Sequence, residues 1–230
     1  MKNGFLSTIL IGMIPMIFTA YRKASADSGS QTEKGAYFIT KISGNINWKS
    51  IPVLPVDKVL WTEDAGIRAH GQLCYDEQNL YVHLSAVEKS IRAENTAPLS
   101  PVHEDSCLEF FFKLKDAKNY FNFEVNPNGC LVIQFGPRRG DRVNLVRNDA
   151  AEYFDIQTGR TSEGWEVFYR IPIEFIRLFY PDYRFEGELT ANMYKCGDET
   201  KHPHYLSWSG INLETPDFHC PEFFGNLYFA

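Results

Sequence analysis

Two glutamates, Glu109 and Glu124, occupy equivalent places in two neighbouring segments of alternating apolar and polar residues. Segments 106–112 and 120–126 are joined by a short polar connection, so we expect them to pair as an antiparallel hairpin. The pairing that makes one face of this hairpin uniformly apolar also places the two glutamates directly opposite each other on the other face. Opposed carboxylates repel, and a shared proton, a cation or a hydroxyl-rich ligand would offset that repulsion.

The register of this hairpin follows from its apolar residues. On the apolar face Phe112 pairs with Phe121, Phe110 with Phe123, and Leu108 with Val125. On the other face Phe111 pairs with Asn122, and Asn126 lies beside Cys107. The alternative for the glutamates is a solvated outer face on which the two carboxylates splay apart in water. An exposed pair of like charges costs only about a few tenths of a kcal/mol.

The same two carboxylates also suit an enzyme. A retaining glycoside hydrolase uses two carboxyl groups about 5 Å apart, one as acid and base and the other as nucleophile. Against this alternative, the chain of 230 residues shows no separate set of substrate-positioning residues. A nucleophilic serine is not indicated, since the sequence holds no Gly-x-Ser-x-Gly motif.

Composition favours a β-rich fold without a nucleic-acid partner. The chain is 15% aromatic, and its 23 Lys and Arg against 29 Asp and Glu give a formal charge of −6, so no basic field would attract phosphates. Strand-like segments bounded by turn residues lie at 54–61, 66–75, 80–87, 106–114, 120–125, 130–135, 153–158, 165–171, 188–194 and 205–208. One helix is predicted at 173–179, before Pro181. These elements predict an all-β fold, an antiparallel, jelly-roll-like β-sandwich with one short helix.

The N-terminal segment has the pattern of a cleaved signal peptide. Lys2 precedes an apolar run over residues 4–21, and Ala24-Ser25-Ala26 supplies a small-x-small cleavage site. We therefore expect a signal peptide over 1–26, a polar linker over 27–36 and one folded domain over 37–230. The mature protein would be secreted or periplasmic with no stable membrane partner. Membrane anchoring is the alternative, because the basic pair Arg22-Lys23 after the apolar run is atypical of a cleaved signal.

A series of short motifs follows the predicted strands. They are Tyr75-Asp76-Glu77, Leu80-Tyr81-Val82, Glu104-Asp105-Ser106 with Leu108-Glu109-Phe110, Phe123-Glu124-Val125-Asn126, Leu206-Ser207-Trp208-Ser209 and Pro221-Glu222-Phe223-Phe224-Gly225-Asn226-Leu227. From about Asn47 to Tyr228, this order resembles carbohydrate-binding module family 9. The resemblance implies a β-sandwich that binds the ends of plant polysaccharide chains such as xylan, commonly beside a xylanase, and that holds structural calcium ions.

The resemblance also implies positions for a sugar site. The strand glutamate of the family matches Glu109, whereas its arginine on the next strand falls at Glu124, which is a departure. The two tryptophans that clamp a sugar ring in the family fall at Val102 or His103, and at Phe218. The family's amide-bearing strand aligns with Asn192 or Tyr194.

The remaining aromatic and metal-binding side chains are less specific. Trp48 and Trp165 are expected in the core, and Trp208, beside two serines, is a further candidate for the site, with Trp61 undecided. The C-terminal third gathers Cys196, His202, His204, His219 and Cys220. A soft metal would accept these ligands, but their spacing fits no standard zinc pattern.

Together these observations favour an exported, non-catalytic carbohydrate-binding module that supports carbohydrate catabolism. The predicted ligand-binding residues are Glu109, Glu124, Asn126, Asn192, Phe218, His103, Tyr194 and Trp208. Calcium is the expected ion and has a structural role, and glycoside hydrolases of the same system are the expected protein partners. The alternative function is a small glycoside hydrolase that uses Glu109 and Glu124.

Overall fold

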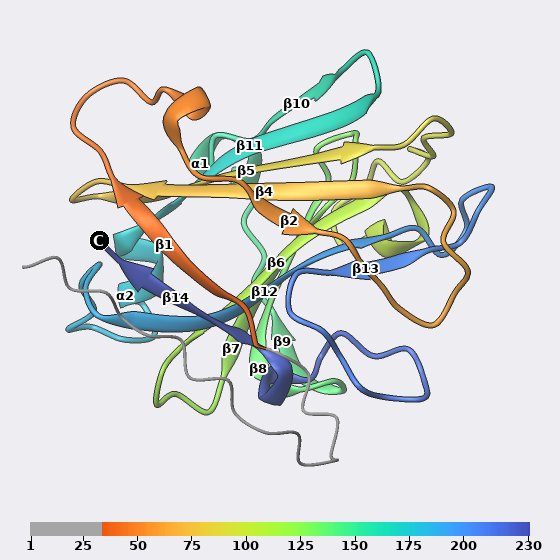
Figure 1. The fold of residues 1–230 in the computed structure, drawn as a ribbon. Coiled ribbons are helices and arrows are strands. Elements are labelled where there is room, and N and C mark those ends of the chain that lie inside the picture. Colours follow the sequence, from red (N-terminus) through yellow and green to blue (C-terminus); the bar gives the residue numbers. More distant parts are fainter. Residues whose placement is uncertain (1–33) are drawn as a thin grey trace, which may run out of the picture. The chain divides into compact units, whose positions relative to one another are not determined.

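The computed structural model describes residues 34–230, which form two packed β-sheets (Figure 1). The first sheet contains β2 (Leu54–Val56), β4 (Arg68–Tyr75), β5 (Asn79–Val87), β10 (Gln157–Arg160) and β11 (Gly164–Pro172). The second contains β3 (Lys58–Val59), β6 (Cys107–Leu114), β7 (Tyr120–Val125), β8 (Leu131–Arg138), β9 (Asp141–Asn144), β12 (Glu188–Cys196), β13 (Tyr205–Ser207) and β14 (Gly225–Phe229). The predicted β-sandwich is confirmed. The predicted signal peptide and most of the linker lie outside the described residues.

Strand β1 (Ala36–Lys41) joins the two sheets. Residues 36–39 pair with β14 and residues 40–41 with β4, and both pairings are parallel. The sandwich is therefore antiparallel except at this bridging strand, which the sequence did not indicate. Its alternating burial places Tyr37 and Ile39 in the core, while Phe38 points outward.

Short helices accompany the strands. They are α1 (Ala150–Tyr153), α2 (Ile173–Arg177) and the 3-10 helices Trp48–Ser50, Val102–Glu104 and Pro221–Phe223. Helix α2 is the predicted one. Helix α1 replaces the start of the strand expected at 153–158, and the chain becomes extended only from Gln157. Asp155, with a φ of 50°, makes the turn between the two, a conformation that aspartate tolerates better than most residues. In the described part of the chain, no helix is long and apolar enough to span a membrane.

The hairpin of β6 and β7 has the predicted register. Its paired residues are Phe112 and Phe121, Phe110 and Phe123, Leu108 and Val125, Glu109 and Glu124, and Phe111 and Asn122. The aromatic side chains of the apolar face are buried between the sheets, where Phe123 stacks on Tyr169 of β11. Trp165 is in this core as expected. Trp48 is only partly buried and packs instead on His83 and Phe168 of the first sheet.

A polar network is buried at the end of β12. Lys195 is completely buried, with its Nζ 3.1 Å from Glu88 Oε2 and 2.7 Å from His204 Nε2. The Ser106 hydroxyl donates to Glu88 Oε1 at 2.9 Å. Burial and the neighbouring Lys195 lower the pKa of His204 to about 3, so the imidazole is neutral and accepts from the ammonium group.

This depressed pKa makes His204 a source of acid sensitivity. In the unfolded chain the imidazole binds a proton below about pH 6.5, whereas in the folded protein it stays neutral down to about pH 3. The contribution of the neutral imidazole to the free energy of unfolding is therefore fully present above about pH 6.5. As the pH is lowered below that value, this free energy decreases by up to about 1.4 kcal/mol per pH unit. We expect His204→Gln to remove that slope. Denaturant unfolding of both proteins at pH 7 and pH 5 measures it, and equal losses in the two proteins would contradict the assignment.

Candidate functional site

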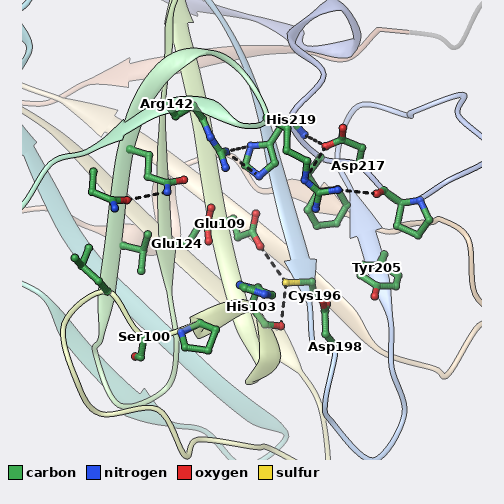
Figure 2. A pocket seen from close by; sticks show the side chains of 18 of the residues that line it. Ser100, His103, Glu109, Glu124, Arg142, Cys196, Asp198, Tyr205, Asp217 and His219 are labelled. Carbon is green, nitrogen blue, oxygen red and sulfur yellow. Dashed lines mark hydrogen bonds and ion pairs between the residues drawn. The ribbon is translucent and has the colours of Figure 1, made fainter.

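A cavity of about 460 Å³ opens on the face of the second sheet that points away from the core (Figure 2). Strands β6 to β9 contribute residues to its floor. Its walls are segments 99–103, 196–205 and 216–219, together with Trp61. The walls come from four separate parts of the chain, so the site is a pocket bounded on several sides.

Two carboxyl groups lie at the floor of this pocket. Glu109 and Glu124 are 2% and 8% exposed, so the alternative of a solvated outer face does not describe this hairpin. Burial raises the pKa of both, and for Glu109 the facing Glu124 raises it further. The Cys196 thiol donates to Glu109 Oε1 at 3.0 Å, and Asn122 Nδ2 donates to Glu124 Oε1 at 2.8 Å. A protonated carboxyl both donates and accepts, which suits a hydroxyl-bearing ligand.

The cation nearest to this chemistry is Arg142, on β9. Its charge opposes the rise in pKa at both Glu109 and Glu124. The guanidinium donates to His219 Nε2 at 2.8 Å, and its buried Nε has no partner among the described residues. Burial and Arg142 lower the pKa of His219 to about 2, so this imidazole is neutral and can accept. Arg142 thus brings a guanidinium charge to a pocket that also holds carboxyl oxygens.

An aromatic wall faces the polar floor. The ring centroid of Trp61 lies 5.6 Å from that of Phe218 and 5.7 Å from that of Tyr205. Trp61 has a φ of 54°, which is unusual for a bulky residue, and its indole N–H donates to the Leu213 carbonyl at 2.7 Å. The other side of the wall is rigid, because Phe218 stacks on Tyr194 at 4.1 Å. A ring-shaped ligand would find a fixed apolar surface here.

The pocket brings together half of the residues predicted for the site. His103, Glu109, Glu124 and Phe218 line it. Asn126, Asn192, Tyr194 and Trp208 do not line it. The segments that carry these four lie close to the pocket, but their side chains point elsewhere.

The two asparagines support the neighbouring backbone. Asn126 Nδ2 donates to Asn95 O and to Asp105 Oδ2, each at 2.8 Å, and is completely buried. The amide of Asn192 is used by Ser209, whose N–H donates to Oδ1 and whose carbonyl accepts from Nδ2. Since these hydrogen bonds occupy both amides, a ligand role for them is corrected to a positioning role.

Tyr194 and Trp208 are packing residues. Tyr194 lies beneath Phe218, and its hydroxyl donates to the Phe218 carbonyl at 3.0 Å. Trp208 is 5% exposed and covers Gly35 and Gly225 so closely that a side chain at either glycine would collide with its ring. The expectation that Trp208 faces the ligand is corrected, since its ring fills the junction of β1, β13 and β14.

A family comparison decides what kind of domain this is. The family described as carbohydrate-binding family 9 matches residues 41–229, almost the whole of the described fold. The chain belongs to carbohydrate-binding family 9. Among curated proteins, no relative matches the sequence.

Three solved structures share the fold. A candidate carbohydrate-binding protein from Bacteroides uniformis is 28% identical, with a TM-score of 0.74 over 86% of this chain and 100% of that one. A family 9 module from Caldicellulosiruptor kristjanssonii in complex with glucose is 13% identical, with a TM-score of 0.59 over 85% and 96%. A family 9 module from Caldicellulosiruptor kristjanssonii in complex with cellotriose is also 13% identical, with a TM-score of 0.58 over 85% of this chain and 93% of that one. Family membership and these neighbours support a carbohydrate-binding role.

Two further pocket residues, Arg142 and Trp61, were not among those predicted for the site, although the sequence had left Trp61 undecided. Arg142 supplies a cation although Glu124 stands at the expected arginine position, and Trp61 supplies a tryptophan although both clamp positions lack one. A signal for Trp61 was present, because it ends a strand-like segment just before the polar turn 62–66. Arg142 had none, since β9 is too polar to be recognised as a strand.

The cysteine and histidine residues of the C-terminal third do not form the metal site considered from the sequence. His204 contacts Lys195 and His219 contacts Arg142, so the imidazoles are directed to different partners. The Cys196 thiol lies close to Cys107 and Glu109 instead.

Two of the buried carboxylates do not fit the calcium that the family resemblance implies. Asp105 is completely buried and accepts from the guanidinium of Arg92 and from Asn126, as well as from two backbone N–H groups. Glu88 is paired with Lys195. Because cationic side chains already neutralise these two groups, neither offers calcium the free oxygens that it requires.

Proposed function

We propose that this pocket binds the end of an oligosaccharide chain and that the protein is a non-catalytic module of a carbohydrate-degrading system. One observation carries the proposal: a cavity of about 460 Å³ sets an aromatic wall against a floor of carboxyl and guanidinium groups. Its volume is within the range of roughly 300 to 1,000 Å³ that is usual for ligand sites. Glycoside hydrolases of the same system are the proposed partners.

The two sides of the pocket match the two kinds of surface on a sugar. A pyranose ring presents an apolar C–H face, which packs on Trp61 and Phe218. Its hydroxyl groups both donate and accept, and they meet Glu109, Glu124 and the guanidinium of Arg142. Because loops bound the pocket on several sides, the end of a chain fits it better than the middle of one.

Hydrolysis is the second function considered, and the geometry favours it less. A retaining hydrolase needs one ionised carboxylate as nucleophile. In this pocket burial raises the pKa of both Glu109 and Glu124, which suits a general acid but singles out neither carboxyl as a nucleophile. Recognition of sugar hydroxyls needs only the two opposed carboxyl groups, whereas hydrolysis needs further groups that position the substrate.

Export is a further part of the proposal. It is supported by the apolar run over residues 4–21 and by Ala24-Ser25-Ala26, and it would place the module where polysaccharides are found. N-terminal sequencing of the exported protein tests it. An intact Met1 in the membrane fraction would replace export by anchoring.

A panel of immobilised plant and host glycans tests the binding function, with released reducing sugar assayed in the same wells. We expect the wild type to be retained on one glycan class without releasing sugar. Glu109→Gln should weaken retention about three- to tenfold, because one neutral hydrogen bond contributes about 0.5–1.5 kcal/mol. The matched control is Glu152→Gln, an exposed residue of α1. Release of reducing sugar by the wild type that Glu109→Gln abolishes would establish the hydrolase instead, and unchanged retention would remove Glu109 from the site.

A further inference from the structure

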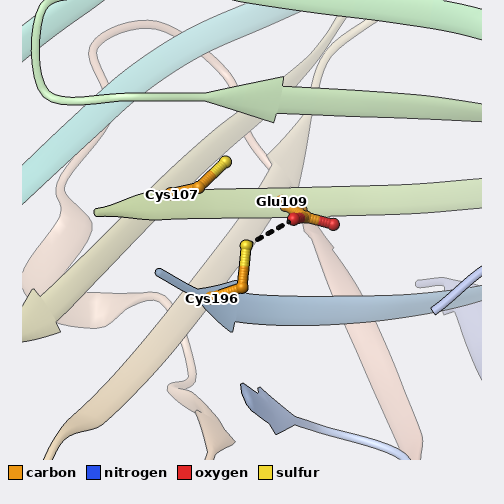
Figure 3. A group of neighbouring side chains, drawn as sticks. All are labelled: Cys107, Glu109 and Cys196. Carbon is orange, nitrogen blue, oxygen red and sulfur yellow. Dashed lines mark hydrogen bonds between the residues drawn. The ribbon is translucent and has the colours of Figure 1, made fainter. Parts of the chain in front are cut away.

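Beneath the pocket, three side chains that bind soft metals lie together on two neighbouring strands (Figure 3). Cys107 on β6 is directly opposite Cys196 on β12, and Glu109 is on the same face of β6 as Cys107. The two sulfur atoms and a carboxylate oxygen all lie within 4.8 Å of one another. The hydrogen bond from Cys196 to Glu109 already joins two of the three groups.

The surroundings of this cluster are those of a preformed site. All three side chains are buried, and they project from paired strands of the second sheet, so no loop has to move to assemble them. Cys196 and Glu109 also line the pocket, which gives an ion a route from solvent. Glu124 lies across from Glu109 on β7 and faces the same space.

We propose that Cys107, Cys196 and Glu109 bind a thiophilic divalent cation, and that Zn²⁺ suits this donor set best. Two thiolates and a carboxylate supply three positions of a tetrahedral site, and the fourth position faces the pocket, where Glu124 or a water molecule completes it. On binding, each S–H bond is replaced by a metal–sulfur bond, and the two thiol protons pass to solvent, together with the carboxyl proton wherever Glu109 holds one. Glu109 belongs both to this group and to the proposed sugar pocket, so a bound ion would occupy one of the oxygens that a sugar would meet.

The donor types separate this site from other ions. Calcium and magnesium prefer oxygen ligands in larger number, so a pair of thiols at the centre disfavours them. An iron–sulfur cluster would use four thiolates, and the group supplies two. Buried cysteines often act as small apolar residues, and both cysteines here have apolar neighbours, but the Cys196 thiol also donates to a carboxyl group.

Titration of the reduced, metal-free protein with Co²⁺, a spectroscopic substitute for Zn²⁺, tests the proposal. We expect one equivalent to produce a thiolate-to-cobalt absorption band and tetrahedral visible bands, and Zn²⁺ to displace them. Cys107→Ser should weaken the apparent affinity by at least about tenfold, whereas Cys74→Ser, on β4 of the other sheet, should leave the titration unchanged. Thermal melts without metal establish that each variant is folded.

X-ray absorption of the zinc-loaded wild type provides a test without substitutions. We expect two sulfur neighbours at about 2.3 Å and the remaining ligands to be oxygen atoms at about 2.0 Å. A titration without the thiolate band would overturn the proposal. So would a band that survives Cys107→Ser and Cys196→Ser, or a zinc shell without sulfur.

Discussion

Replacing Lys195 by methionine is expected to lower the free energy of unfolding by about 3–5 kcal/mol. Lys195 is completely buried, and its ammonium group lies 3.1 Å from the Glu88 carboxylate. Methionine fills similar space but leaves that carboxylate buried without a cation. The penalty for an uncompensated buried charge exceeds the loss of a surface ion pair several-fold.

Urea unfolding of three variants checks this prediction. The double variant Glu88→Gln/Lys195→Met should recover most of the loss, because it removes both charges together. Lys41→Met is the control, since Lys41 and Glu77 form an exposed pair 2.7 Å apart whose loss should change the free energy of unfolding far less. If the double variant were as unstable as Lys195→Met alone, the ion pair would not be the cause.

The sequence was sufficient to predict the hairpin at the centre of the fold. Phe110, Phe112, Phe121 and Phe123 allow only one register that buries them all, and the register places Glu109 opposite Glu124. Strand β9 could not be recognised in this way, because its burial pattern shows no inward-facing apolar row. Strand β1 bridges two sheets through parallel pairings, which depend on tertiary contacts and not on local pattern.

The site was predictable only where its residues lie on that hairpin. Asn126 and Asn192 are polar and close to the pocket, yet buried backbone groups compete for their amides and use them fully. Sequence spacing does not show such hydrogen bonds. Arg142 and Trp61 reach the pocket from a polar strand and a turn, so their role became visible only in the folded chain.

Arg142→Met is expected to weaken binding of the retained oligosaccharide by about tenfold to a hundredfold. Hydrogen bonds to a charged group contribute about 1.5–3 kcal/mol, and about 1.4 kcal/mol corresponds to a factor of ten in affinity. The guanidinium lines the pocket and its partners, His219 and the Tyr120 hydroxyl, are both neutral, so its charge faces the sugar oxygens. Arg138→Met is the matched control, because Arg138 is exposed and pairs only with Asp141 at 3.7 Å.

Calorimetric titration of the wild type and these two arginine variants, with the oligosaccharide that the glycan panel identifies, tests the central claim most directly. The proposed site predicts one binding event per molecule in the wild type and in Arg138→Met, and affinity at least about tenfold lower in Arg142→Met. Thermal melts establish that all three proteins are folded. Equal affinity in Arg142→Met and the wild type would contradict the assignment of carbohydrate binding to this pocket.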